Sequence, residues 1–121
     1  MATESDHLKQ ADHNQRFLGE IDSNKFPDWA ATVAFYTAVH LAQALLKRGG
    51  DTCNSHTTRN RKLRSKYPAI WKLYQPLYSY SRLARYWCMK VKPADIPYLT
   101  RRLAKVDREV KAILKPKKGS A

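Results

Sequence analysis

The sequence predicts an all-α protein, an up-and-down bundle of four to five helices. Apolar residues recur at intervals of three and four along nearly the whole chain, and no stretch alternates as a strand does. Proline, glycine and serine divide the chain into lengths typical of helices. A chain of 121 residues with 43% hydrophobic residues can also bury one core. We therefore expect one domain over residues 1–115, followed by a basic, disordered tail over 116–121.

The first helix is expected from about Glu4 to Asp22. The second begins near Pro27, because a proline at the first helical position lacks only an N–H that would be unpaired there. Gly49 and Gly50 are suited to cap its end. The residues of this helix are apolar on almost all of its sides, which predicts that it is the central, most buried helix of the bundle. The alternative is a membrane span, which we reject because the apolar run is barely long enough and polar residues interrupt it.

Ser55 is a suitable N-cap for a third helix, and Tyr67-Pro68 interrupts or ends that helix. A fourth helix is expected over about Ala69 to Lys90, with a kink or a fresh start at Pro76. The last helix follows the sequence KPAD. Its apolar residues alternate in steps of three and four, which predicts a packing seam. The seam consists of Ile96, Leu99, Leu103, Val106, Val110 and Ile113.

The positive charge is concentrated in the middle of the chain. The formal net charge is +13, yet Thr52 to Ala94 contains ten Lys and Arg and no Asp or Glu. The other residues hold thirteen basic and ten acidic side chains. A localised positive face is therefore expected, and it would attract a polyanion: nucleic acid, an acidic protein or an anionic membrane surface.

The start, MATESDH, has no signal-peptide pattern, so a cytoplasmic location with Cys53 and Cys88 as free thiols is expected; a disulfide between them is the alternative. No cofactor and no metal are expected, because glycine-rich phosphate loops, nucleophile elbows and paired-cysteine zinc motifs are missing. Cys53 and His56 have zinc-like spacing, but we interpret them as loop residues. Glu4 and His7 have the spacing of half a di-iron motif, and we interpret them as a solvated first turn.

His56 is the leading catalytic candidate. It opens the third helix, and Arg59 follows one turn later on the same face. Nearby arginines disfavour the imidazolium, which keeps a histidine available as a neutral base near pH 7. Metal-free RNA cleavage needs such a base for the 2′-OH proton and cations for the phosphorane. The alternative, a polar N-terminal turn, stays open. His40, inside the apolar helix, is interpreted as a hydrogen-bonded core residue.

Further cations surround these candidates. A dense run follows Arg59, and its members cannot all share one helix side, so part of it is a supporting charged surface. The run consists of Arg61, Lys62, Arg64 and Lys66, which we assign to nucleic-acid binding. On the fourth helix, arginines alternate with tyrosines, a pattern that can contact phosphates and stack bases. There we assign Arg82, Arg85 and Tyr86 to the site, and Tyr74 and Tyr78 to the core.

Three segments together resemble the HEPN superfamily of small helical-bundle proteins. They are DWAATVAFYTAVHLAQALLKRGG, SHTTRNRKL and LYSYSRLARY, and they span Asp28 to Tyr86. The shared pattern is Tyr-x-x-x-His in an apolar helix (Tyr36 and His40), a glycine loop, a histidine opening the next helix, and Arg-x-x-Arg-Tyr on the following one. The resemblance implies a HEPN-like bundle, usually homodimeric.

The resemblance also implies RNA or nucleotide binding, and in many members metal-independent endoribonuclease activity in toxins or antiphage defence. A nucleotidyltransferase-type antitoxin is the partner that it implies for a toxin. The catalytic motif of such members is an arginine, a polar residue and a downstream histidine. Arg59 and Asn60 match its first half, but the following NRKLRSKYP has no histidine, so His56 is the candidate to replace it. With Arg85, these residues form the expected catalytic set. The alternative is a non-catalytic dimeric module whose basic face binds an acidic protein.

Overall fold

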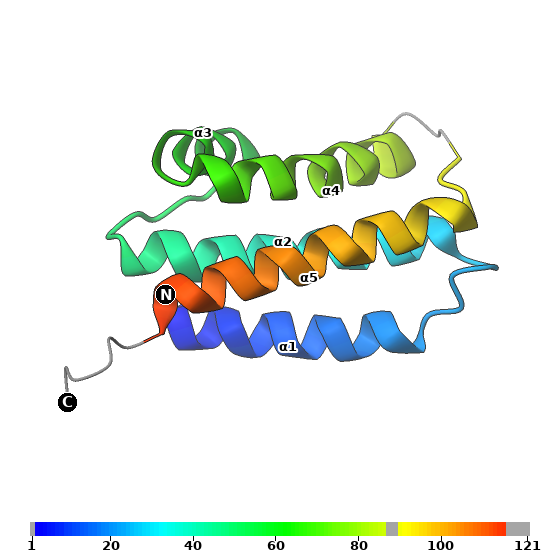
Figure 1. Cartoon of the computed structure of the whole chain (residues 1–121), viewed down its shortest axis with the longest axis horizontal. Coiled ribbons are helices and arrows are strands. Elements are labelled where there is room, and N and C mark those ends of the chain that lie inside the picture. The colour runs from blue at the N-terminus through cyan, green and yellow to red at the C-terminus, as the bar shows by residue number, and fades with distance from the viewer. Residues whose placement is uncertain (1, 87–89, 116–121) are drawn as a thin grey trace.

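A computed structural model describes residues 2–86 and 90–115, and within them the chain is an all-α bundle. Five α-helices and one short 3-10 helix follow one another (Figure 1). They are α1 (Glu4–Glu20), α2 (Pro27–Arg48), α3 (His56–Lys66), α4 (Pro68–Tyr86), η1 (Pro93–Asp95) and α5 (Ile96–Leu114). The predicted fold class is confirmed. The expected tail over 116–121 and Cys88 lie outside the described residues.

Helix α2 is the centre of the bundle. The four other α-helices all pack against it, and Figure 1 shows α1 on one side of α2 and the α3–α4 pair on the other. Ala30, Ala34, Ala38 and Ala42 form a stripe of small side chains along α2, and each is at most 1% exposed. α2 has the length and hydropathy of a membrane span, but 72% of the window that meets this test is buried inside the bundle. The prediction of a central helix is confirmed.

The helix boundaries follow the local signals. Ser55 caps α3 by accepting a hydrogen bond from the Thr58 backbone N–H at 3.1 Å. The end of α2 is a left-handed turn, because Gly50 has φ +88° and the Asp51 N–H returns to the Leu46 carbonyl at 2.9 Å. This turn directs the chain back toward the start of α3. Of the two expectations at Pro76, the fresh start is wrong, because α4 continues through Pro76 as one helix.

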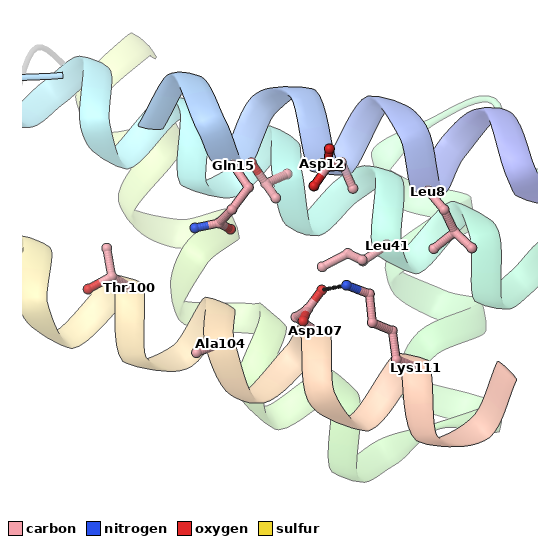
Figure 2. A pocket seen from close by; sticks show the side chains of 10 residues that line it. Leu8, Asp12, Gln15, Leu41, Thr100, Ala104, Asp107 and Lys111 are labelled. Carbon is pink, nitrogen blue, oxygen red and sulfur yellow. Dashed lines mark ion pairs between the residues drawn. The ribbon is translucent and has the colours of Figure 1, made fainter. Parts of the chain in front are cut away.

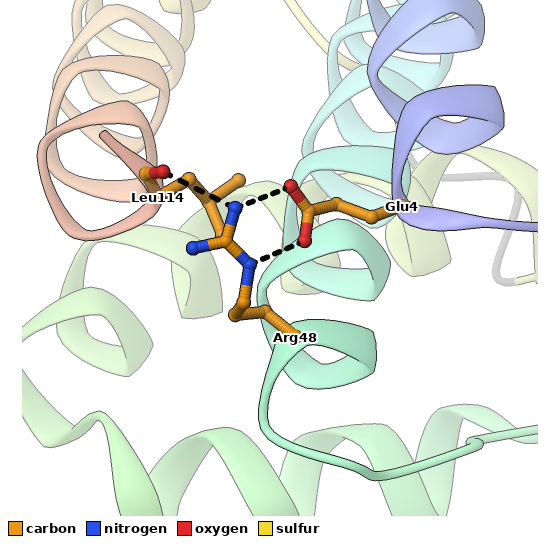
Figure 3. Close-up of polar contacts among 3 residues, drawn as sticks. All are labelled: Glu4, Arg48 and Leu114. Atoms are coloured by element: carbon orange, nitrogen blue, oxygen red, sulfur yellow. Dashed lines mark hydrogen bonds and ion pairs between the residues drawn. The ribbon is translucent and has the colours of Figure 1, made fainter. Parts of the chain in front are cut away.

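An ion pair closes one end of the bundle. The Arg48 guanidinium donates to both carboxylate oxygens of Glu4, at 2.6 and 2.7 Å, and to the Leu114 carbonyl at 3.2 Å (Figure 3). One side chain of α2 therefore joins the start of α1 to the end of α5. Glu4 keeps an exposed position, as expected of a solvated first turn, and it also pairs with a residue 44 positions away in the sequence.

The buried seam of α5 differs from the prediction at its last position. Leu114 is 6% exposed, whereas Ile113 is 46% exposed. Leu114 lies 18 residues, or about five turns of a straight helix, after Ile96. A strict alternation of three- and four-residue steps has the shorter period of a supercoiled seam. Its last step therefore falls on Ile113, one residue before the buried Leu114. The other five seam residues are buried as expected: Ile96, Leu99, Leu103, Val106 and Val110.

Candidate phosphate-binding site at the start of α3

The buried face of α3 contains an arginine. Only Arg59 and Leu63 are buried on this helix, and they lie one turn apart on the side that faces α2 and α4. Arg59 is 6% exposed. The spacing in the sequence predicts that Arg59 shares a face with His56, but it does not predict the burial of Arg59. The sequence does contain one signal for this burial: Arg59 lies four residues before Leu63, the most apolar residue of α3.

Arg59 binds His56 directly. Its Nη1 lies 2.7 Å from His56 Nδ1. A guanidinium can only donate, so Nδ1 accepts and the proton of a neutral His56 ring lies on Nε2. The contact therefore fixes the tautomer of His56 and occupies the lone pair that a general base would use.

Arg59 lies in the core without a compensating charge. Among residues 2–86 and 90–115, no carboxylate forms an ion pair with it. Its Nε is buried and has no hydrogen-bond partner, and the same is true of Asn60 Oδ1. Burial raises the pKa of Tyr74 to about 12, although the charge of Arg59 and the contact of its side chain with the Tyr74 hydroxyl oppose this rise. Buried polar groups normally have partners, so this set of unsatisfied atoms needs an explanation.

His56 sits among aromatic rings that connect it to α4. Its ring lies 5.6 Å from that of Phe35 and 5.8 Å from that of Tyr78, measured between centroids. Arg82 lies over the Tyr78 ring at 5.6 Å and over Tyr86 at 5.3 Å. The cation–π contacts hold this arginine beside the histidine while leaving its side chain exposed.

Arg85 approaches the same region from α4. It donates to the hydroxyl of Tyr36, a residue of α2, and to that of Tyr86 at 2.6 Å. Its guanidinium also lies over both rings, at 5.1 Å from the Tyr36 centroid and 4.9 Å from that of Tyr86. The Tyr36 that the sequence analysis noted only as part of a motif therefore positions a candidate cation.

The electrostatics of His56 link these residues. Partial burial lowers the pKa of His56 below its ordinary value, and the charges of three arginines lower it further. These arginines are Arg59, Arg85 and Arg82, in decreasing order of effect. These effects favour the neutral imidazole. The structure thus brings His56, Arg59, Arg82 and Arg85 into one neighbourhood, built from α3 and α4 against α2.

The remaining basic residues of α3 have other surroundings. Lys62 and Lys66 both pair with Asp51, Lys62 at 3.5 Å. The Arg64 guanidinium lies 5.7 Å from the Trp71 ring centroid. Arg61 is exposed. The basic run is therefore divided, since Arg59 points into the core, the two lysines are partly neutralised, and Arg61 and Arg64 face outward.

Two histidines that were not assigned to the site contact each other between α1 and α2. His7 on α1 and His40 on α2 form a contact between their Nδ1 atoms at 3.0 Å. Burial lowers the pKa of each, and the Arg59 charge contributes to both shifts. His40 is thus hydrogen-bonded as predicted. The expectation of a solvated turn for His7 was wrong, because its ring is partly buried in a contact with His40, 33 positions away in the sequence.

A separate groove lies between α1 and α5, with α2 as its floor (Figure 2). Its volume is about 230 Å³, and the Asp107–Lys111 ion pair lies along one wall at 2.9 Å. Neither histidine nor arginine occurs among the described residues that line it, so this groove is distinct from the arginine site. In the part of the chain that the structure describes, no three His, Cys, Asp or Glu residues are grouped to hold a metal ion.

Comparisons of the chain with protein-family models, curated proteins and solved structures give no match. The resemblance to the HEPN superfamily therefore depends on the motif residues alone.

Proposed function

We propose that this protein is a HEPN-like RNA-binding protein that binds a phosphodiester of RNA at Arg59 and cleaves the strand without a metal ion. The observation that carries the proposal is the buried Arg59 guanidinium, which has a free Nε and no carboxylate partner within the described residues. A buried charge without a counter-ion is costly, and a bound phosphate would supply the missing acceptors and the opposite charge. Arg82 and Arg85 add positive charge beside it.

The contact between Arg59 and His56 suggests how binding prepares the chemistry. In the free protein Arg59 occupies the Nδ1 lone pair of His56. When the guanidinium turns to a phosphate oxygen, it releases this lone pair beside the substrate. His56 then accepts the proton of the 2′-hydroxyl, and the 2′ oxygen attacks phosphorus. The bond to the 5′ oxygen breaks, the leaving oxygen takes a proton, and a 2′,3′-cyclic phosphate remains. Arg59 and Arg85 stabilise the charge that develops on the phosphorane.

The remaining parts of the proposal come from the resemblance. We propose a homodimer and, if the protein is a toxin, a nucleotidyltransferase-type antitoxin as its partner. Asn60 orients the phosphate, and Tyr86 contributes a face for base stacking.

The test is an RNA degradation assay in the presence of EDTA. We expect the wild-type protein to cleave single-stranded RNA and His56→Ala to lose about 10²- to 10⁴-fold in rate, the contribution of a general base. His13→Ala is the matched control, because His13 is an exposed histidine of α1. Equal cleavage by the wild type and His56→Ala, or none by either, removes the catalytic part of the proposal.

Binding is tested separately through its salt dependence. The logarithm of the association constant should fall linearly with the logarithm of salt concentration, with a slope of about −0.7 for each phosphate that a cation contacts on a single strand. Arg85→Ala should make this slope less steep, whereas Arg61→Ala should leave it nearly unchanged. Binding that salt does not affect would contradict a phosphate site.

A second candidate function, a non-catalytic interaction module, is favoured by a different surface. Phe17, Phe26 and Trp29 are 52%, 52% and 60% exposed, and together with Ile21 they line one pocket at the α1–α2 turn. Grouped, exposed aromatic residues are typical of a protein contact surface. If this function is correct, Trp29→Ser should abolish a stoichiometric protein complex or dimer in sedimentation experiments without weakening RNA binding.

A further inference from the structure

One cavity extends the arginine site toward the start of α2. It lies between the first two turns of α2 and the last turn of α4, and its volume is about 260 Å³. Figure 1 shows the start of α2 and the end of α4 at the same end of the bundle. The cavity is lined by Asp28, Trp29, Thr32, Ala84 and Arg85. Because Arg85 also lies beside His56, the cavity and the arginine site share one cation.

One face of α2 connects the cavity to the arginine site. Asp28, Thr32 and Tyr36 follow one another at intervals of four residues, so they lie in a row on that face. Asp28 is about 12 Å from Tyr36 along the helix axis, at a rise of about 1.5 Å per residue. Arg85 lines the cavity with Asp28 and also donates to the Tyr36 hydroxyl. A group attached to a phosphate at Arg85 can therefore enter the cavity and reach Asp28.

Asp28 and Arg85 have opposite charges and line the same cavity, yet they do not pair. Among the residues that the structure describes, Asp28 forms no ion pair, and Arg85 donates to the hydroxyls of Tyr36 and Tyr86 instead. The cavity thus presents a carboxylate, which only accepts hydrogen bonds, and a separate guanidinium, which only donates them. A ligand that matches both has N–H donors at one end and a negative charge at the other. A nucleotide has this composition.

The size and the aromatic wall of the cavity suit a single nucleobase. A volume of about 260 Å³ is slightly below that of pockets for drug-sized ligands, which is about 300–1,000 Å³. Trp29 is 60% exposed, so its indole ring is available to stack on a base. Thr32 adds no free donor, because its hydroxyl already donates to the Asp28 carbonyl at 2.9 Å. The choice of base therefore depends on the Asp28 carboxylate.

We propose that this cavity binds a guanine base of the RNA, with the Asp28 carboxylate accepting hydrogen bonds from its Watson–Crick edge, Trp29 stacking on its face and Arg85 at the adjoining phosphate. This inference rests on the proposed function and names the nucleotide that the site selects. Guanine offers two neighbouring donors on that edge, N1–H and the 2-amino group, which match the two carboxylate oxygens. Adenine and cytosine each offer one amino group beside an acceptor, and uracil offers one N–H between two carbonyl oxygens.

Selection of guanine can be measured without any cleavage. The probes are labelled 2′-O-methyl oligouridylates, which lack the attacking hydroxyl, with uridine, guanosine or inosine at one central position. Fluorescence anisotropy gives their affinities. We expect the guanosine probe to bind about 5- to 150-fold more tightly than the uridine probe, the discrimination of one bidentate contact between a side chain and a base. Inosine lacks the 2-amino group and should lose most of this gain. These probes test the contact on the wild-type protein, whatever the folding of the variants.

The variants separate base recognition from a change in net charge. Asp28→Asn should lose the preference for guanosine, because an amide offers one acceptor oxygen beside its N–H donors. It should bind a xanthosine probe more tightly than the guanosine probe, since xanthine has a carbonyl oxygen in place of the 2-amino group. It should also bind the uridine probe at least as tightly as the wild type, because a negative charge near the phosphates is removed. Asp12→Asn is the matched control, since it removes the same charge from an exposed position of α1 and should keep the preference for guanosine.

The outcomes distinguish the inference from the proposed function. If the wild type binds the three probes equally and with the expected salt dependence, or if Asp28→Asn keeps the preference for guanosine, the inference is wrong while the proposed binding function stands. If the wild type binds no probe even at low salt, the proposed function itself fails and the inference falls with it. A preference for guanosine that is lost in Asp28→Asn and kept in Asp12→Asn supports the inference. Trp29→Ser should then weaken every probe, because stacking tolerates any base, whereas a protein-contact role of Trp29 would leave RNA binding unchanged.

Discussion

Replacing Arg59 by methionine should stabilise the free protein and abolish RNA binding. Arg59 is 6% exposed, its Nε has no partner, and no described carboxylate forms an ion pair with it. Methionine fills much of the same volume with an unbranched apolar chain. A residue that weakens the folded state while it binds the ligand is the expected pattern at a functional site.

The magnitude follows from the contacts of Arg59. A buried polar group without a partner costs about 1–3 kcal/mol, and a hydrogen bond to a charged group contributes about 1.5–3 kcal/mol. Arg59→Met removes both the unpaired Nε and the bond to His56. Because His56 is only half-buried, its Nδ1 can accept a hydrogen bond from water in the variant. The free energy lost with the Arg59–His56 bond therefore lies at the lower end of its range. Replacing buried ion pairs by apolar residues of similar volume is often neutral or stabilises by about 1–4 kcal/mol. The two terms for Arg59 together lead us to expect a rise in the free energy of unfolding of up to about 1.5 kcal/mol.

The assay is urea unfolding at pH 7, followed by far-ultraviolet circular dichroism. Leu63→Ala is the matched control, since Leu63 lies on the same buried face one turn later and its truncation should cost about 2–5 kcal/mol. Fluorescence anisotropy with a labelled oligouridylate measures binding by the same proteins. A loss of more than about 1 kcal/mol in Arg59→Met would refute the reasoning, because it would mean that Arg59 is compensated within the fold. Undiminished RNA binding would refute the phosphate site.

Three further predictions concern stability. Leu114→Ala should lower the free energy of unfolding by about 2 kcal/mol or more, whereas Ile113→Ala should change it by less than about 0.5 kcal/mol, measured by urea unfolding; equal effects would contradict the observed seam. The hydrogen bond from Lys66 lowers the pKa of Asp51 below its ordinary 3.8, so the stability that Asp51 contributes is present above that value and is lost as the pH falls through the lower, folded-state pKa. Asp51→Asn should therefore show a smaller fall in the urea midpoint than the wild type between pH 5 and pH 2, and an identical fall would exclude this contribution. Burial raises the pKa of Tyr74 to about 12, so its contribution is lost as the pH rises from about 10 toward that value; Tyr74→Phe should be at least as stable as the wild type at pH 7 and should lose less stability at pH 11, as thermal melts would show.

Much of the fold could be predicted because its signals act within one or two helical turns. Ser55 caps α3, Pro27 begins α2, Gly50 ends it, and Tyr67 precedes the proline that separates α3 from α4. Each of these depends on backbone geometry that neighbouring residues determine. The long apolar run of α2 likewise predicted the core, because burial on all sides leaves a pattern in the sequence itself.

The candidate site was predicted only in part. His56, Arg59, Arg82 and Arg85 were selected from motif spacing, and the structure brings them together. The cations that follow Arg59 were grouped with them, but Lys62 and Lys66 pair with Asp51 instead. A run of like charges in sequence spreads around a helix, so its members meet different neighbours.

By itself the sequence determined an all-α bundle, the position of its helices and a basic middle third. Only the tertiary structure decided that Arg59 lies in the core without a described carboxylate partner, and that His7 contacts His40. The physical reason is that α1 and α3 both pack against α2. That packing selects which polar side chains come into contact across 33 positions of sequence, and no local spacing rule describes it.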